Sequence, residues 1–150
     1  MPSRIPLFKA KKLGYERDMV SFSIKYGTVP NFLTTAIVDT GCPFIIISQN
    51  DIDKTRIPYR NKPSLSKPVS LGNLILELKD LGECEIFFRD YNNQSIKYKE
   101  RIYVGIPIGL KPGQMLAQQL PSIVGKGFLD NNFLSVIKNK DGTSHLQEAE

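Results

Sequence analysis

Strict alternation of apolar and polar side chains from Val20 to Tyr26 is the feature that most constrains this chain. The apolar residues Val20, Phe22, Ile24 and Tyr26 fall on one face, and Ser21, Ser23 and Lys25 fall on the other. A period of two residues is that of a β-strand with one buried face. We therefore predict a strand over residues 20–26, followed by a turn at residues 27–31.

Short apolar runs separated by turn residues continue along the chain. They predict strands over residues 34–38, 44–48, 69–71, 73–78, 84–89, 96–104, 122–124 and 134–137, the last of which is expected to close the sheet. Turn residues separate these strands at Asp80–Gly82 and Asp90–Asn93. Residues 51–56 fit one helical turn, and a short helix is predicted over residues 126–133. The expected fold class is all-β, mainly strands with one short helix.

A length of 150 residues fits one domain of ordinary size. We divide the chain into an N-terminal extension, residues 1–19, a domain, residues 20–138, and a polar C-terminal tail, residues 139–150. The proline-rich and lysine-rich residues 50–68 are interpreted as a surface loop. The 41% of apolar residues is typical of a globular protein. No apolar run approaches the roughly 20 residues of a membrane helix, and no signal peptide is recognisable, so we expect a cytoplasmic protein without a membrane partner.

Cysteine and histidine are too few for several classes of chemistry. Cys42 and Cys84 match no zinc-ligand spacing and are predicted to be free thiols. His145 is the one histidine and falls in the polar tail, which we expect to be frayed. Ser-His-Asp and Cys-His nucleophile systems and most metal sites need a well-held imidazole, so no metal and no cofactor are predicted. The net charge of +5 is mild, and nucleic acid is not an expected partner.

A carboxylate follows directly on an apolar run in the segment Ala36-Ile37-Val38-Asp39-Thr40-Gly41. Burying a carboxylate is costly unless it is paired or hydrogen-bonded, so this position invites a functional explanation. Gly41 lacks a Cβ and lets backbone N–H groups approach the carboxylate. The alternative is that Asp39 merely begins a solvated tight turn.

A second segment, Ile123-Val124-Gly125, is followed by Lys126-Gly127-Phe128-Leu129. Together with Asp39-Thr40-Gly41 after two apolar residues, it resembles the retropepsin-like (pepsin-clan) single-domain aspartic proteases. In that family the strand that carries the second segment crosses near the catalytic strand, and a short helix follows it. The resemblance implies a retropepsin-like closed β-barrel that is functional as a symmetric homodimer, and an aspartic endopeptidase that hydrolyses polypeptide substrates.

The resemblance also implies roles for single residues. Asp39 of each subunit supplies one carboxylate of the catalytic pair. Thr40 bonds across the dimer axis, and Gly41 lets the backbone donate to the carboxylates. A flap that covers the substrate corresponds to Val69–Leu78, with Gly72 and Asn73 at its tip, although an ordinary hairpin turn fits these residues equally.

Two positions depart from the family pattern. Cys42-Pro43 stands where Ala or Ser is common, and Lys126-Gly127 stands where Arg followed by Asp or Asn is frequent. A lysine does not reproduce the bidentate contact of a guanidinium. The alternative function is therefore a non-proteolytic dimerisation or peptide-binding module of the same fold. A third hypothesis is a basic β-domain that binds nucleic acid through residues 54–67.

Overall fold

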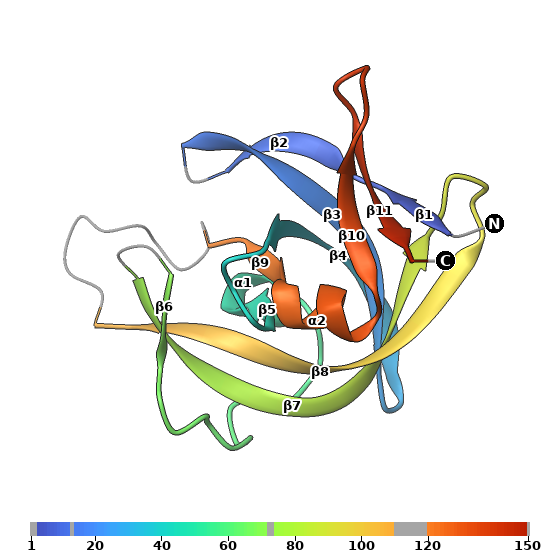
Figure 1. Ribbon diagram of the computed structural model, residues 1–150. Helices are drawn as coiled ribbons and strands as arrows, with labels where there is room; N and C mark the ends of the chain where they lie inside the picture. Colours follow the sequence, from blue (N-terminus) through green and yellow to red (C-terminus); the bar gives the residue numbers. More distant parts are fainter. Residues whose placement is uncertain (1–2, 13, 72–73, 110–119, 150) are drawn as a thin grey trace.

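The computed structural model describes residues 3–12, 14–71, 74–109 and 120–149 (Figure 1). It is mainly β, as predicted, with two short helices where the sequence predicted one short helix, at residues 126–133, and one helical turn, at residues 51–56. The strands are β1 (Arg4–Pro6), β2 (Phe8–Lys12), β3 (Tyr15–Tyr26), β4 (Val29–Asp39), β5 (Ile45–Ser48), β6 (Val69–Leu71), β7 (Leu74–Arg89), β8 (Ser95–Ile108), β9 (Ser122–Gly125), β10 (Leu134–Lys138) and β11 (Ser144–Glu148). The helices are α1 (Gln49–Ile52) and α2 (Lys126–Asn131).

Two sheets organise these strands. The larger has eight strands in the order β2-β3-β4-β9-β5-β8-β7-β6, and β3 makes an additional short pairing with β7. That pairing joins Ser23–Lys25 to Glu85–Phe87 and bends the sheet back on itself (Figure 1), but the sheet is not clearly closed into a barrel. The smaller sheet has three strands in the order β1-β11-β10.

Strand β7 corrects the sequence prediction of two strands separated by a turn at Asp80–Gly82. The strand runs unbroken from Leu74 to Arg89, and its register against β8 shifts between Asp80 and Gly82. The Asp80 carboxylate accepts a hydrogen bond from the Gly82 amide at 2.7 Å, and Gly82 has a φ of 82°. These residues therefore form a β-bulge rather than a chain reversal, because β8 continues to pair on both sides of the irregularity.

The two ends of the chain meet in the smaller sheet. The expected N-terminal extension contributes β1, β2 and the start of β3, and β1 pairs with β11 in antiparallel fashion. Strand β10, which we expected to close the larger sheet, pairs with β11 instead. Strands β1 and β11, near the two ends of the chain, are thus held in place by pairing with each other.

His145 lies in β11 and not in a frayed tail, so that prediction is wrong. Only 4% of the surface of His145 is exposed to solvent. The ring nitrogens lie 3.2 Å from Asn139 Nδ2 and 3.0 Å from Gln147 Oε1. The polar sequence misled because β11 is the central strand of its sheet, and distant groups such as the Tyr91 ring, 6.2 Å from the imidazole between centroids, pack against His145.

The core has two hydrophobic clusters. The larger contains the aromatic rings of Phe22, Phe88 and Phe128, in which Phe88 stacks on Phe128 and is tilted against Phe22. The smaller includes Ile46, Leu76, Leu78, Tyr103 and Ile123, and it also contains Cys42. The smaller cluster therefore packs against the loop that follows Asp39. In the described part of the chain, neither helix is long and apolar enough to span a membrane.

Candidate active site

Asp39 is the last residue of β4, and β9 runs parallel to β4 beside it (Figure 1). The register pairs Ile37 with Ile123, Val38 with Val124, and Asp39 with Gly125. On its other side β9 is antiparallel to β5. Strand β9 therefore lies between β4 and β5, the two strands that residues 40–44, the Asp39 loop, connect. The structure thereby brings together the two segments that the sequence singled out.

The Asp39 carboxylate is held by the turn that follows it. Its Oδ1 accepts a hydrogen bond from the Gly41 amide at 2.9 Å, and the Cys42 amide donates to the Asp39 carbonyl at 3.2 Å. A Cβ added at Gly41 would lie 3.2 Å from Asp39 Oδ1, so a glycine allows this close approach. Asp39 is half-buried and Thr40 is exposed. The carboxylate is thus fixed by the backbone while remaining partly open to solvent.

The beginning of α2 is bonded to the same loop. The Lys126 amide donates to the Cys42 carbonyl at 2.6 Å, and the Gly127 amide donates to the Pro43 carbonyl at 3.1 Å. The first amides of a helix have no partner within the helix, and here the loop supplies their acceptors. A Cβ added at Gly125 would overlap the backbone of Cys42 and Phe44. The two segments are therefore interlocked through the backbone.

The two residues that depart from the family pattern have local partners. Cys42 is 7% exposed, and its thiol donates to the Phe44 carbonyl at 3.6 Å. Burial raises the pKa of this thiol, and the nearby Asp39 charge raises it further. Cys42 is thus a buried thiol that stays neutral at physiological pH. Lys126 forms an exposed ion pair with Asp130 of its own helix at 3.8 Å.

The expected flap is a pair of antiparallel strands. Val69 of β6 pairs with Leu76 of β7, and Leu71 pairs with Leu74. Gly72 and Asn73, the predicted tip, lie outside the described residues. Val69, Leu71 and Leu74 pack against the smaller core cluster, which includes Cys42. The base of this hairpin therefore shares a hydrophobic cluster with the Asp39 loop.

Sequence reasoning missed a polar network around Asp51. Asp51 Oδ2 accepts hydrogen bonds from Ser122 Oγ at 2.6 Å and from Thr34 Oγ1 at 3.0 Å. Ser48 is the N-cap of α1, and its Oγ accepts from the Asp51 amide at 3.2 Å. The pattern Ser48-x-x-Asp51 resembles the capping sequence that begins many helices, and this signal could have identified the helix start.

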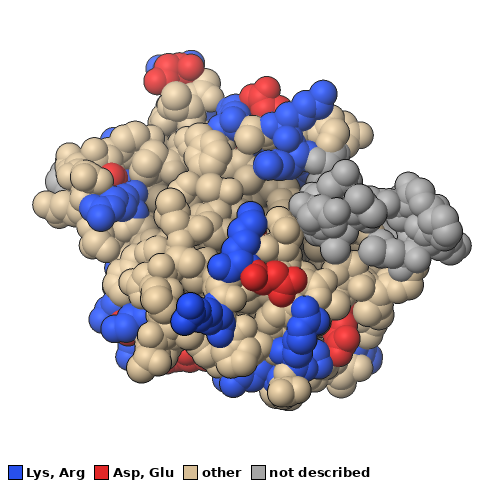
Figure 2. Space-filling model, turned by 180° about the vertical axis from the view of Figure 1, so that it is seen from behind, with Lys and Arg blue, Asp and Glu red and all other residues tan. Residues whose placement is uncertain are grey.

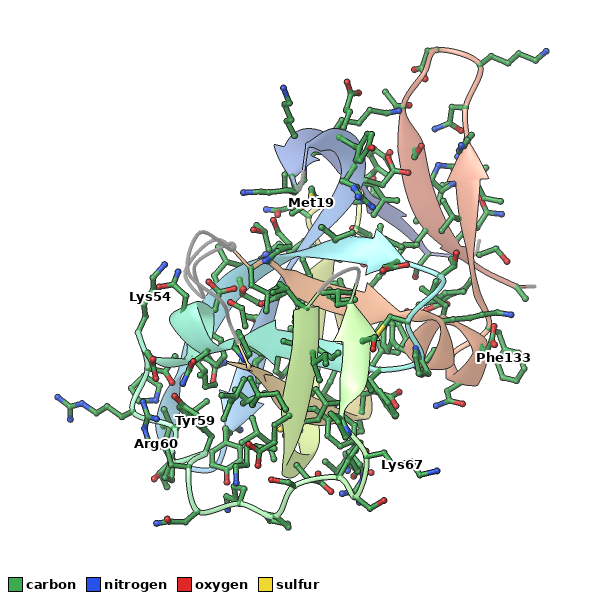
Figure 3. The ribbon with its side chains drawn as sticks, turned by 90° about the vertical axis from the view of Figure 1, so that its left-hand side faces the viewer. Met19, Lys54, Tyr59, Arg60, Lys67 and Phe133 are labelled. Carbon is green, nitrogen blue, oxygen red and sulfur yellow. The ribbon has the colours of Figure 1, made fainter. Side chains whose placement is uncertain are left out.

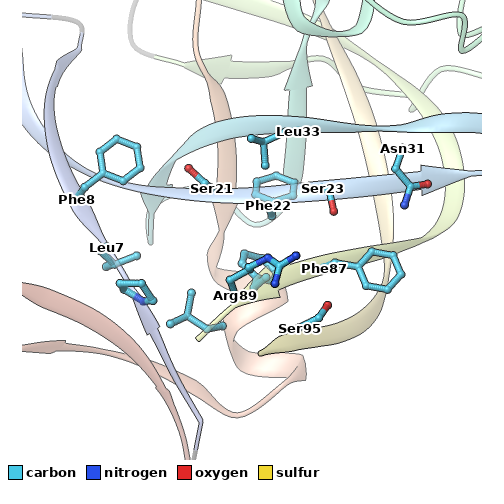
Figure 4. Close-up of a pocket in the computed structure, with 13 residues that line it drawn as sticks. Leu7, Phe8, Ser21, Phe22, Ser23, Asn31, Leu33, Phe87, Arg89 and Ser95 are labelled. Atoms are coloured by element: carbon cyan, nitrogen blue, oxygen red, sulfur yellow. The ribbon is translucent and has the colours of Figure 1, made fainter. Parts of the chain in front are cut away.

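A cavity of about 590 Å³ lies elsewhere, near Phe8, Leu33, Phe87 and Arg89 (Figure 4). Leu33 is six residues before Asp39 on β4, which corresponds to about 20 Å along an extended strand. This cavity is therefore remote from the Asp39 loop. Across the described ranges, no group of three or more potential metal-ligating side chains comes together.

The basic segment, residues 54–67, does not form one patch. Figure 3 shows Lys54 and Arg60 on one side of the molecule and Lys67 on the other. Lys54 and Arg60 have acidic partners, Asp51 at 4.0 Å and Asp53 at 3.6 Å. On the face in Figure 2, basic side chains are scattered among acidic and uncharged ones. This arrangement favours a solvated surface over a nucleic-acid interface.

No protein-family model matches this chain, and no curated protein matches it. The geometry around Asp39 therefore carries the functional argument.

Proposed function

We propose that this protein is an aspartic endopeptidase of the retropepsin-like type that works as a homodimer. The observation that carries the proposal is the parallel register of β4 and β9, which sets Gly125 opposite Asp39 and ties α2 to the Asp39 loop. If Asp39 merely began a solvated turn, there would be no need for the Ile123-Val124-Gly125 segment beside it or for the close backbone contacts at Gly125. The proposal includes the β3–β7 pairing as the closure of a retropepsin-like barrel.

The chemistry follows from bringing two identical carboxylates together. One chain supplies one Asp39, and a two-fold axis that passes near the loop supplies the second. Two carboxylates at close range share one proton, because ionising both is electrostatically costly. The ionised member removes a proton from a bound water, whose oxygen attacks the peptide carbonyl carbon. The protonated member donates to the carbonyl oxygen, and proton return to the amide nitrogen accompanies cleavage of the C–N bond.

The remaining loop residues hold this pair. The Gly41 amide keeps one oxygen of Asp39 in place, and Thr40 is exposed as a group that bonds across a dimer axis must be. The hairpin of β6 and β7 is proposed to cover an extended polypeptide, which binds as an added strand. Because Cys42 is buried and neutral, its thiol adds no charge beside the two aspartates.

Cleavage of an unfolded protein tests the proposal at mildly acidic pH. Wild type is expected to cleave it, and Asp39→Asn is expected to lose activity by about 10³-fold or more, because the amide neither accepts a proton from water nor shares one with its partner. Asp53→Asn is the control, since Asp53 is an exposed carboxylate at the C-cap of α1 that accepts a hydrogen bond from Tyr59. Equal cleavage by wild type and Asp39→Asn would contradict the mechanism. A strictly monomeric mass in solution at assay concentration would contradict it independently.

The buried Cys42 thiol and the local Lys126–Asp130 ion pair favour one alternative. In it, the same dimer binds extended peptide without hydrolysing it, because fold does not determine function. That alternative predicts peptide binding by wild type and by Asp39→Asn, with intact peptide recovered from both. Asp39-dependent cleavage excludes it.

A further inference from the structure

The polar network around Asp51 joins every strand that meets at the Asp39 loop. Thr34 lies on β4, Ser122 begins β9, and Ser48 ends β5. All three residues are buried, with exposures of 7%, 0% and 1%. Asp51 itself is the one carboxylate within this group, and a single oxygen, Oδ2, accepts from both hydroxyls.

The Ser122 hydroxyl both accepts and donates a hydrogen bond within this network. It accepts the Ser48 amide at 3.0 Å and donates to Asp51 at 2.6 Å. Short hydrogen bonds to an ionised acceptor are stronger than those between neutral groups. Buried hydroxyls and amides that lose their partner cost free energy, so this network resists any shift of β9 along β4.

The register of β9 determines the geometry of the Asp39 loop. Ser122 pairs with Ala36, and three residues further along the same ladder Gly125 pairs with Asp39. Beyond Gly125, the amides of Lys126 and Gly127 bond to the loop carbonyls. A displacement of β9 at Ser122 is therefore passed directly to the hydrogen bonds that hold the loop.

We propose that Asp51 is a positioning residue for the Asp39 pair: by fixing Ser122 and Thr34 it sets the β4–β9 register that holds the catalytic loop. This inference rests on the proposed function. Asp51 touches no reacting atom and acts through the backbone of β9. Lys54, 4.0 Å from the other oxygen of Asp51, is exposed and contributes little to the network.

Asp51→Asn tests the inference, with Asp53→Asn as the matched control. Both changes remove one negative charge at α1, and both carboxylates accept from a hydroxyl and lie near a basic side chain. The Asp53 partners, Tyr59 and Arg60, do not belong to β9. Thr34→Val is a second variant that removes one hydroxyl donor with little change in shape.

Two measurements are made on folded protein: peptide hydrolysis, and amide hydrogen exchange at Gly41, Lys126 and Gly127. Asp51→Asn is expected to lower kcat about tenfold or more with KM within about twofold, because a misplaced catalytic group lowers transition-state stabilisation more than substrate binding. Exchange at the three amides is expected to accelerate about tenfold. Thr34→Val should shift both in the same direction by less, and Asp53→Asn should leave both unchanged.

The outcomes separate this inference from the proposed function. If wild type cleaves no peptide, the proposed function fails, and the positioning role toward a catalytic pair fails with it. If wild type is active, unchanged kcat and unchanged exchange in Asp51→Asn overturn the positioning role while the protease assignment stands. Equal changes in Asp51→Asn and Asp53→Asn overturn it too, because general loosening near α1 would then explain both.

Discussion

Replacing Gly125 by alanine is the sharpest test of the interlocked loop. The added Cβ would lie 2.8 Å from the Phe44 amide nitrogen and closer still to the carbonyl oxygens of Cys42 and Phe44. All three neighbours are backbone atoms of a loop that is hydrogen-bonded to α2. Relief therefore requires the loop or β9 to move as a unit, which breaks the bonds from Lys126 and Gly127.

The expected loss of stability depends on whether the atoms next to the added Cβ belong to side chains or to the backbone. Extra methyl groups in packed interiors cost about 1–3 kcal/mol where side chains can adjust. At Gly125 no side chain can give way, and two loop hydrogen bonds worth about 1 kcal/mol each are also at risk. We expect Gly125→Ala to lose about 3–5 kcal/mol of unfolding free energy, together with the proposed activity.

Gly105→Ala is the matched control, because it is also a buried strand glycine. Its added Cβ would meet the side-chain carbons Ile46 Cγ2 at 2.7 Å and Leu76 Cδ1 at 3.2 Å and no backbone atom. The leucine methyl can rotate away, whereas the branched Ile46 side chain yields less. We expect a loss of about 1–3 kcal/mol there. Urea unfolding monitored by circular dichroism measures both variants. A cost for Gly125→Ala at or below that of Gly105→Ala would refute the argument from rigid backbone contact.

Two further predictions concern stability. Phe133 is 73% exposed and has a φ of 55°. Phe133→Gly therefore removes backbone strain and loses little buried surface. We expect the urea midpoint to rise by the equivalent of about 1 kcal/mol, and a lower midpoint would contradict this. Burial, with smaller contributions from Asp80 and Glu83, raises the pKa of the Cys84 thiol from 9.0 to about 11. On a rise in pH, the unfolded state therefore loses the Cys84 proton at a lower pH than the folded state does. The contribution of Cys84 to the free energy of unfolding is constant below pH 9 and falls by up to about 3 kcal/mol as the pH rises through 11. Urea midpoints at pH 8 and 10.5 should diverge more for wild type than for Cys84→Ala, and equal divergence would be the contrary result.

Local patterns were enough to predict much of the strand content. Alternation identified the strand around Val20–Tyr26, and the bounds of β6 match the prediction. Asp80–Gly82 was misread because an aspartate followed two residues later by glycine suits both a turn and a bulge. Only the continuous pairing with β8 decides between them, and that pairing is a long-range property.

The candidate site was predictable in part for a similar reason. Asp39 and Gly125 belong to motifs with a recognisable local pattern, and the structure pairs them. Only one part of the Asp51 network has a local pattern, the capping pair Ser48 and Asp51. Thr34 and Ser122 are far away in the sequence, and only the strand order brings them to Asp51. The position of His145 was predicted wrongly, since a polar sequence gives no sign that its segment will pair with β1 and β10 as the central strand of a sheet.

The pairing of β1 with β11 has a consequence for how the molecule behaves in concentrated solution. Arg4 lies opposite Gln147, so this pairing joins residues that are almost the whole chain apart. Forming it therefore has the greatest entropic cost of loop closure. We expect β1 to dock last during folding and to detach first on warming. A detached β1 uncovers one edge of β11, which the same strand of a neighbouring molecule fits equally well. Domain-swapped dimers are then expected under mildly destabilising conditions, through a surface unrelated to any axis at the aspartate loop.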